Sequence, residues 1–108
     1  MRKTSGDRQN EHILVCLSSS PSNERIVCTA AQMARAFGGN LTALYVQTPD
    51  AAGMSAEDQS RLQANTRLAE RLGAEIVTTH GEDVATQIVE YARLSGVTRV
   101  IIGRSAAR

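Results

Sequence analysis

Short apolar runs alternate with helix-length segments along this chain. Ile13 to Leu17 is too short for a helix and ends at a serine cluster and Pro21, which is typical of a strand buried on both faces. The next segment carries apolar residues at helical spacing, and Gly38-Gly39 ends it. We predict Ser20 as the N-cap of this helix, with Ser22 as its close rival. The residues expected to face the core are Ile26, Val27, Ala30, Met33, Ala34 and Phe37.

The same alternation continues to the end of the chain. Leu41 to Val46 is a second predicted strand, and a helix capped by Ser55 follows, with Leu62, Ala69 and Leu72 inward and its Gln, Asn, Arg and Glu residues outward. Glu75 to Thr79 is more polar and indicates an edge strand. A third helix, capped by Asp83 and ended by Gly96, precedes a last strand over Thr98 to Ile102. Its predicted inward residues are Ala85, Ile88, Val89 and Ala92.

Strands and helices that alternate in this way predict an α/β fold, an open parallel sheet with helices on both faces. We expect the strand order 3-2-1-4. The domain should cover residues 11–108, after a disordered polar arm over residues 1–10. The apolar last strand would have an open edge, so we expect the chain to be a fragment that lacks a fifth strand and to pair with a second copy through that edge.

The composition argues against nucleic-acid-binding and membrane proteins. The chain has 108 residues and a formal net charge of +1, which gives no electrostatic case for binding nucleic acid or an anionic membrane. No apolar stretch reaches the roughly 20 residues that span a bilayer. Cys16 and Cys28 are interpreted as buried reduced thiols of a cytoplasmic protein, and His80 as a loop residue; no metal site is expected.

A serine pair and a tyrosine are the main candidate chemistry. Ser18 and Ser20 follow the first strand, where an open α/β sheet presents N–H groups and hydroxyls to phosphate. Twenty residues separate Ser20 from the run Leu41-Thr42-Ala43-Leu44-Tyr45. The spacing therefore predicts a site for a small phosphorylated ligand. Each residue also has a plain structural interpretation: a turn or cap for the serines, strand packing for Thr42 and Ala43, and a core position for Tyr45.

The segments His12–Ser18, His80–Ala85 and Val100–Ser105 resemble the universal stress protein domain of the KdpD family, membrane sensor histidine kinases that control potassium uptake. The resemblance implies the open α/β fold of universal stress proteins and adenine nucleotide alpha hydrolases. It also implies a cytoplasmic regulatory domain whose partners are the other domains of a two-component, osmosensing kinase in the cell membrane.

A subset of that family binds cyclic di-AMP through Ser-x-Ser, twenty residues, then Phe-Thr-Ala-x-Tyr. The chain matches at Ser18, Ser20, Thr42, Ala43 and Tyr45, and it carries Leu41 where the pattern has phenylalanine. The resemblance thus implies a cyclic dinucleotide ligand and no cofactor. Arg104, after the last strand, could reach a phosphate bidentately or be a solvated surface residue.

Two alternatives remain open beside the cyclic di-AMP receptor. The first is an ATP-binding universal stress protein, but Ser18 stands where that group has aspartate, and Ala106 where its pattern has the second glycine. The second is an interaction module without a ligand. No nucleophile, base and orienting residue occur together in the pattern, so we predict that this domain has no catalytic residues and is not an enzyme.

Overall fold

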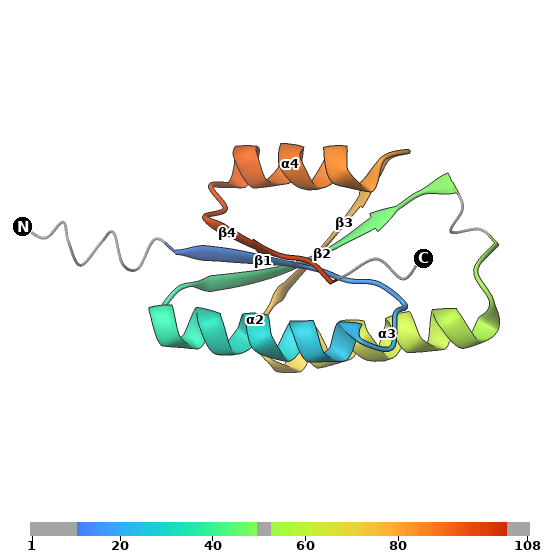
Figure 1. Ribbon diagram of the computed structural model, residues 1–108, viewed down its shortest axis with the longest axis horizontal. Helices are drawn as coiled ribbons and strands as arrows, with labels where there is room; N and C mark the ends of the chain where they lie inside the picture. Colours follow the sequence, from blue (N-terminus) through green and yellow to red (C-terminus); the bar gives the residue numbers. More distant parts are fainter. Residues whose placement is uncertain (1–10, 50–52, 104–108) are drawn as a thin grey trace, which may run out of the picture.

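The computed structural model describes residues 11–49 and 53–103. Its elements alternate as predicted, and Figure 1 shows them in sequence colours. All pairings in the four-stranded sheet are parallel and the order is β3-β2-β1-β4, which confirms the predicted fold class and strand order. The elements are β1 (His12–Cys16), α2 (Asn23–Phe37), β2 (Asn40–Gln47), α3 (Ala56–Arg71), β3 (Glu75–His80), α4 (Val84–Ser95) and β4 (Arg99–Ile101).

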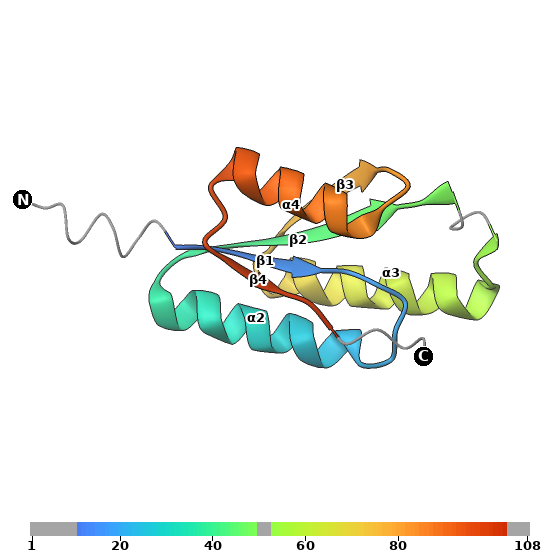
Figure 2. The same cartoon turned by 45° about the horizontal axis from the view of Figure 1, so that its top comes forward.

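The helices form a layer on each side of the sheet. Figures 1 and 2 show α2 and α3 on one face and α4 on the other. Successive strand residues point to opposite faces, so each strand feeds two cores. Ile13 and Val15 pack toward α2, whereas Leu14 packs with Leu44 and Ile88 toward α4. All three β1 residues are fully buried, as predicted for a central strand.

Several predicted helix ends are confirmed. Gly38 and Gly96 end α2 and α4 with φ of 67° and 69°, a left-handed backbone that glycine adopts without steric cost. Ser55 caps α3 by accepting a hydrogen bond of 3.0 Å from the Asp58 N–H. Asp83 is the N-cap of α4, where its carboxylate accepts from the Thr86 hydroxyl at 2.5 Å.

The predicted cap of α2 is wrong, because Ser22 and not Ser20 is the N-cap. The Ser20 hydroxyl accepts from the Ser22 N–H at 3.2 Å, and the Ser20 carbonyl accepts from the Asn23 N–H at 3.0 Å. Ser20 therefore belongs to the turn before the helix. The Ser22 side chain makes no capping bond.

Helical periodicity predicted the wrong burial for some side chains. Phe37 is 38% exposed because it is the last residue of α2, where the Arg99 guanidinium lies 4.5 Å from its ring centre. Val89 is 64% exposed and Ala85 is exposed as well, since only Ile88 of α4 reaches the deep core. Asn65, expected on the outside, is 5% exposed.

Some predictions fall outside the described residues, namely the polar arm, the fifth-strand argument and Arg104. Among the described strands, β4 pairs with β1 and has no neighbour on its other side. No helix in the described part of the chain is long and apolar enough to cross a membrane.

Candidate functional site

A cavity of about 680 Å³ opens at the carboxyl ends of β1 and β2. We call it the carboxyl-end cavity, and residues 18–22, which form one wall, the serine loop. Tyr45 of β2 lines it from the sheet, and Asp58 and Arg61 line it from α3. Ile88 and Ile102 add apolar surface from α4 and from the end of β4.

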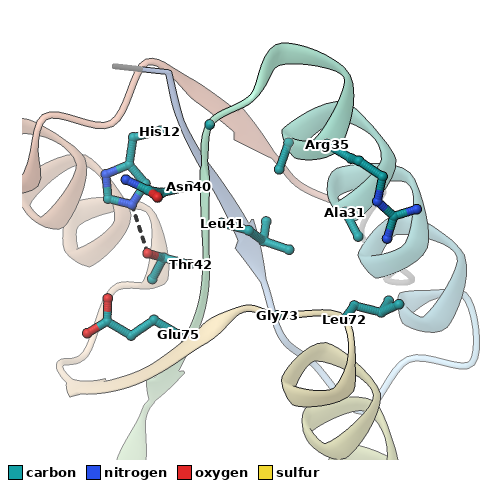
Figure 3. A pocket seen from close by; sticks show the side chains of 11 residues that line it. His12, Ala31, Arg35, Asn40, Leu41, Thr42, Leu72, Gly73 and Glu75 are labelled. Atoms are coloured by element: carbon teal, nitrogen blue, oxygen red, sulfur yellow. Dashed lines mark hydrogen bonds between the residues drawn. The ribbon is translucent and has the colours of Figure 1, made fainter. Parts of the chain in front are cut away.

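A second cavity, of about 400 Å³, lies at the opposite end of the sheet and is called the amino-end cavity. Polar side chains from the first residues of β1, β2 and β3 line it, together with the last turns of α2, as Figure 3 shows. The polar members are His12, Arg35, Asn40, Thr42 and Glu75.

The structure brings together only part of the predicted site. Ser18, Ser20 and Tyr45 all line the carboxyl-end cavity, as the parallel-strand argument requires. Leu41 and Thr42 line the amino-end cavity instead. Leu41 and Tyr45 are four positions apart, about 13 Å along β2, so one compact ligand face does not include both.

Ala43 takes no part in either cavity. It is fully buried in the core between the sheet and α2, packed in the same cluster as Ile13 and Val15. Its small side chain therefore serves packing, which agrees with the structural interpretation of this position.

Thr42 joins three elements through His12. Its hydroxyl lies 2.8 Å from His12 Nε2, a contact drawn in Figure 3, and His12 Nδ1 lies 3.2 Å from the Ser95 carbonyl at the end of α4. A carbonyl only accepts hydrogen bonds, so Nδ1 carries a proton, and in the neutral ring Nε2 accepts from Thr42. This chain of contacts ties β2 to β1 and α4.

Side-chain amides and a guanidinium hold the carbonyls of the serine loop. Asn65 Nδ2 donates to the Ser18 carbonyl at 2.9 Å, and an Arg61 terminal nitrogen donates to the Ser19 carbonyl at 3.1 Å. Asn23 Nδ2 donates to the Cys16 carbonyl, just before the loop, at 2.8 Å. The loop's acceptors are thus directed into the protein.

The backbone N–H donors of the serine loop make fewer hydrogen bonds than its carbonyls do, and we call an N–H group without a partner uncommitted. The Ser20 N–H donates to the Ser18 hydroxyl at 3.2 Å. The N–H groups of Ser19 and of Glu24, in the first turn of α2, have no hydrogen-bond partner among residues 11–49 and 53–103. Uncommitted N–H groups near a helix start attract anions.

Charge in the carboxyl-end cavity is sparse. Arg61 is the only cationic residue in the described part of its lining, and it pairs with Asp58 at 3.2 Å and with Glu57 at 3.7 Å. Burial raises the pKa of the Cys16 thiol from 9.0 to about 11, so the thiol stays protonated at neutral pH. No cluster of three potential metal ligands occurs within the described ranges.

Sequence reasoning missed Asn23, Arg61 and Asn65. Asn23 is 2% exposed, and its Oδ1 has no partner in the part of the chain that the structure describes. Asn65 could have been found, because it lies three residues after Leu62 and four before Ala69, on the apolar stripe itself. A polar residue on such a stripe indicates a buried hydrogen bond.

A model of the universal stress protein family matches residues 9–108. The chain is 44% identical over 99 residues to the sensor protein KdpD of Clostridium acetobutylicum, covering 92% of this chain and 11% of that protein. It is 32% identical over 96 residues to KdpD of Escherichia coli, covering 89% and 11%. The chain thus spans about a tenth of the length of these curated relatives.

Solved structures share the fold. A universal stress protein in complex with cAMP aligns with a TM-score of 0.64 at 22% identity, over 85% of this chain and 71% of that one. The universal stress protein of Archaeoglobus fulgidus in complex with dAMP aligns with a TM-score of 0.60 at 21% identity, over 87% and 80%.

Proposed function

Because the chain belongs to the universal stress protein family, we propose that it is a regulatory domain of a KdpD-like sensor histidine kinase and that it binds cyclic di-AMP. Support for the kinase setting comes from the similarity to two KdpD sensor proteins, of which this chain matches a small part. In this proposal the domain is cytoplasmic, and its partners are the other domains of a potassium-responsive two-component kinase. It carries no catalytic residue itself.

The observation that carries the ligand proposal is the meeting of Ser18, Ser20 and Tyr45 around one cavity. Its volume of about 680 Å³ lies within the roughly 300–1,000 Å³ typical of small-molecule sites. Phosphates would dock on the serine hydroxyls and on the uncommitted N–H groups of Ser19 and Glu24. Adenine would pack on the Tyr45 ring and the neighbouring apolar wall.

Binding would regulate the kinase by a shift of population. A ligand stabilises one arrangement of this domain against its neighbours only by as much as it prefers that arrangement. The serine loop is hydrogen-bonded to α3 through Asn65 and Arg61, so we propose that a change in the loop on binding is passed to that helix through these two side chains.

An adenine mononucleotide is the second candidate ligand. The two solved relatives with cAMP and dAMP favour it, since both bind an adenine nucleotide on this fold. The sequence argues against ATP, because Ser18 replaces the aspartate of the ATP-binding pattern. We therefore expect ATP to bind much more weakly than cyclic di-AMP.

Calorimetric titration of the purified protein with each nucleotide tests the proposal. We expect measurable heat with cyclic di-AMP, a much weaker response to ATP, and weaker cyclic di-AMP binding by Ser20→Ala. Ser60→Ala, an exposed serine of α3 outside the cavity lining, is the matched control and should bind like the parent. ATP binding as tight as cyclic di-AMP binding, or an unchanged isotherm for Ser20→Ala, would overturn the proposal.

A further inference from the structure

Arg61 is placed where a phosphate on the serine loop would need a cation. It projects from α3 into the lining of the carboxyl-end cavity, and one terminal nitrogen donates to the Ser19 carbonyl at 3.1 Å. The uncommitted N–H of Ser19 belongs to the same residue. Arg61 therefore contacts the loop residue whose N–H is uncommitted, and both residues line the carboxyl-end cavity.

The guanidinium is already engaged by two carboxylates from the first turn of α3. Asp58 Oδ1 lies 3.2 Å from the nitrogen that contacts Ser19, and Glu57 Oε2 lies 3.7 Å from the other terminal nitrogen. The Arg61 side chain is 33% exposed, and both carboxylates are more exposed than it is. Ion pairs with this much solvent contact are weak and can exchange partners at little cost.

Phosphate is a strong competitor for such a group. The planar guanidinium carries five donors in a fork that matches two phosphate oxygens. Without a ligand, the three ionised side chains sum to one negative charge beside the cavity, which disfavours an anionic nucleotide.

We propose that Arg61 is the phosphate-binding cation of this site and that Asp58, assisted by Glu57, competes with the nucleotide for it and thereby lowers the affinity. The inference rests on the proposed function and adds to it an acidic restraint on affinity. It assigns three α3 residues for which the serine and tyrosine pattern gives no role.

Titrations with cyclic di-AMP at low salt, on the whole chain, test this inference. Asp58→Asn should raise the affinity about three- to tenfold, and salt should reduce the gain. Glu70→Gln removes the same charge from an exposed position near the end of α3 and should change the affinity by less than about twofold. Arg61→Gln should lower the affinity about tenfold or more, and Arg61→Lys should lie between the two.

The double variant separates competition from simple repulsion. If Asp58 acts by occupying Arg61, the gain from Asp58→Asn disappears in the Arg61→Gln background. A gain that persists there, or equal gains from Asp58→Asn and Glu70→Gln, contradicts the inference and leaves the proposed function intact. A parent protein that binds neither cyclic di-AMP nor ATP overturns both. Thermal melts of each variant show that the comparison is made on folded protein.

Discussion

Thr42 and Tyr45 are three residues apart in the sequence, yet they serve opposite ends of one strand. Tyr45 lines the carboxyl-end cavity beside the serine loop, whereas Thr42 is buried against His12 at the other end. Residues that are close together in a sequence motif need not share a site in a strand. Each residue advances about 3.3 Å along the strand, and successive side chains point to opposite faces of the sheet. Part of the serine-to-tyrosine pattern therefore specifies the sheet, and part specifies the cavity.

Replacing Thr42 distinguishes these two roles. Thr42→Val keeps the side-chain shape and removes the hydroxyl 2.8 Å from His12, so we expect a loss of about 0.5–1.5 kcal/mol in the free energy of unfolding. Cyclic di-AMP affinity should stay within about twofold of the parent, since Thr42 does not line the carboxyl-end cavity. Urea denaturation and calorimetry measure the two effects. Loss of affinity without loss of stability would place Thr42 in the ligand site.

Cys16 makes the stability dependent on alkaline pH. Its pKa rises from 9.0 to about 11 on folding, so between these values the folded state holds a proton that the unfolded state has lost. Stability is therefore full below pH 9 and falls as the pH rises toward 11, by about 1–2 kcal/mol for a partly buried group.

Denaturation curves from pH 8 to pH 11 check the Cys16 effect. Cys16→Ala should show a shallower decline than the parent, and Cys28→Ala, which removes the other free thiol, should decline like the parent. Identical slopes for the parent and Cys16→Ala would show that burial does not hold this thiol protonated.

At the scale of elements, the sequence predicts where strands and helices end, because this depends on adjacent residues. It does not predict which helix face is buried, because this depends on how the elements pack together. The run Ile13 to Leu17 and the left-handed glycines determine strand and helix ends through backbone sterics, and these predictions are confirmed. The inward face of α4 is not a local property, because it depends on how the helix crosses the sheet. Val89 is exposed for that reason, and Asn65 is buried because the serine loop supplies a carbonyl for it.

The open side of β4 gives a prediction at the same scale. Val100 in β4 and Ile102 directly after it are exposed, and within the described residues no strand pairs with the outer side of β4. Unpaired strand groups beside apolar side chains favour pairing with another copy. We therefore predict that the protein self-associates, and that Ile102→Lys reduces this by placing a charge at the edge.

Sedimentation at several concentrations tests self-association. Leu94→Lys, at an exposed position of α4 rather than on a strand, is the matched control and should associate like the parent. A parent protein that stays monomeric at every concentration would show that this edge is not an interface.

At the scale of the molecule, one cavity lies at each end of the sheet, and the carboxyl-end cavity is the one of these two that combines a cation with uncommitted N–H groups near the start of a helix. The carboxyl-end cavity joins the serine loop, uncommitted N–H groups and Arg61, whereas the amino-end cavity contains the His12–Thr42 contact. Sequence order predicted the first of these locations, because parallel strands present their carboxyl ends at one edge. It did not predict that α3 supplies the charge, since that depends on how α3 packs against the loop.

Amide chemical-shift mapping by NMR with cyclic di-AMP tests the central claim most directly. In a chain of 108 residues each backbone amide reports its own surroundings. We predict that the largest shifts fall on Ser19, Glu24 and Tyr45, with Arg61 side-chain resonances moving in parallel, while His12 and Asn40 stay in place. Shifts concentrated on His12, Asn40 and Thr42, or no shifts at saturating nucleotide, would contradict the assignment of the carboxyl-end cavity as the ligand site.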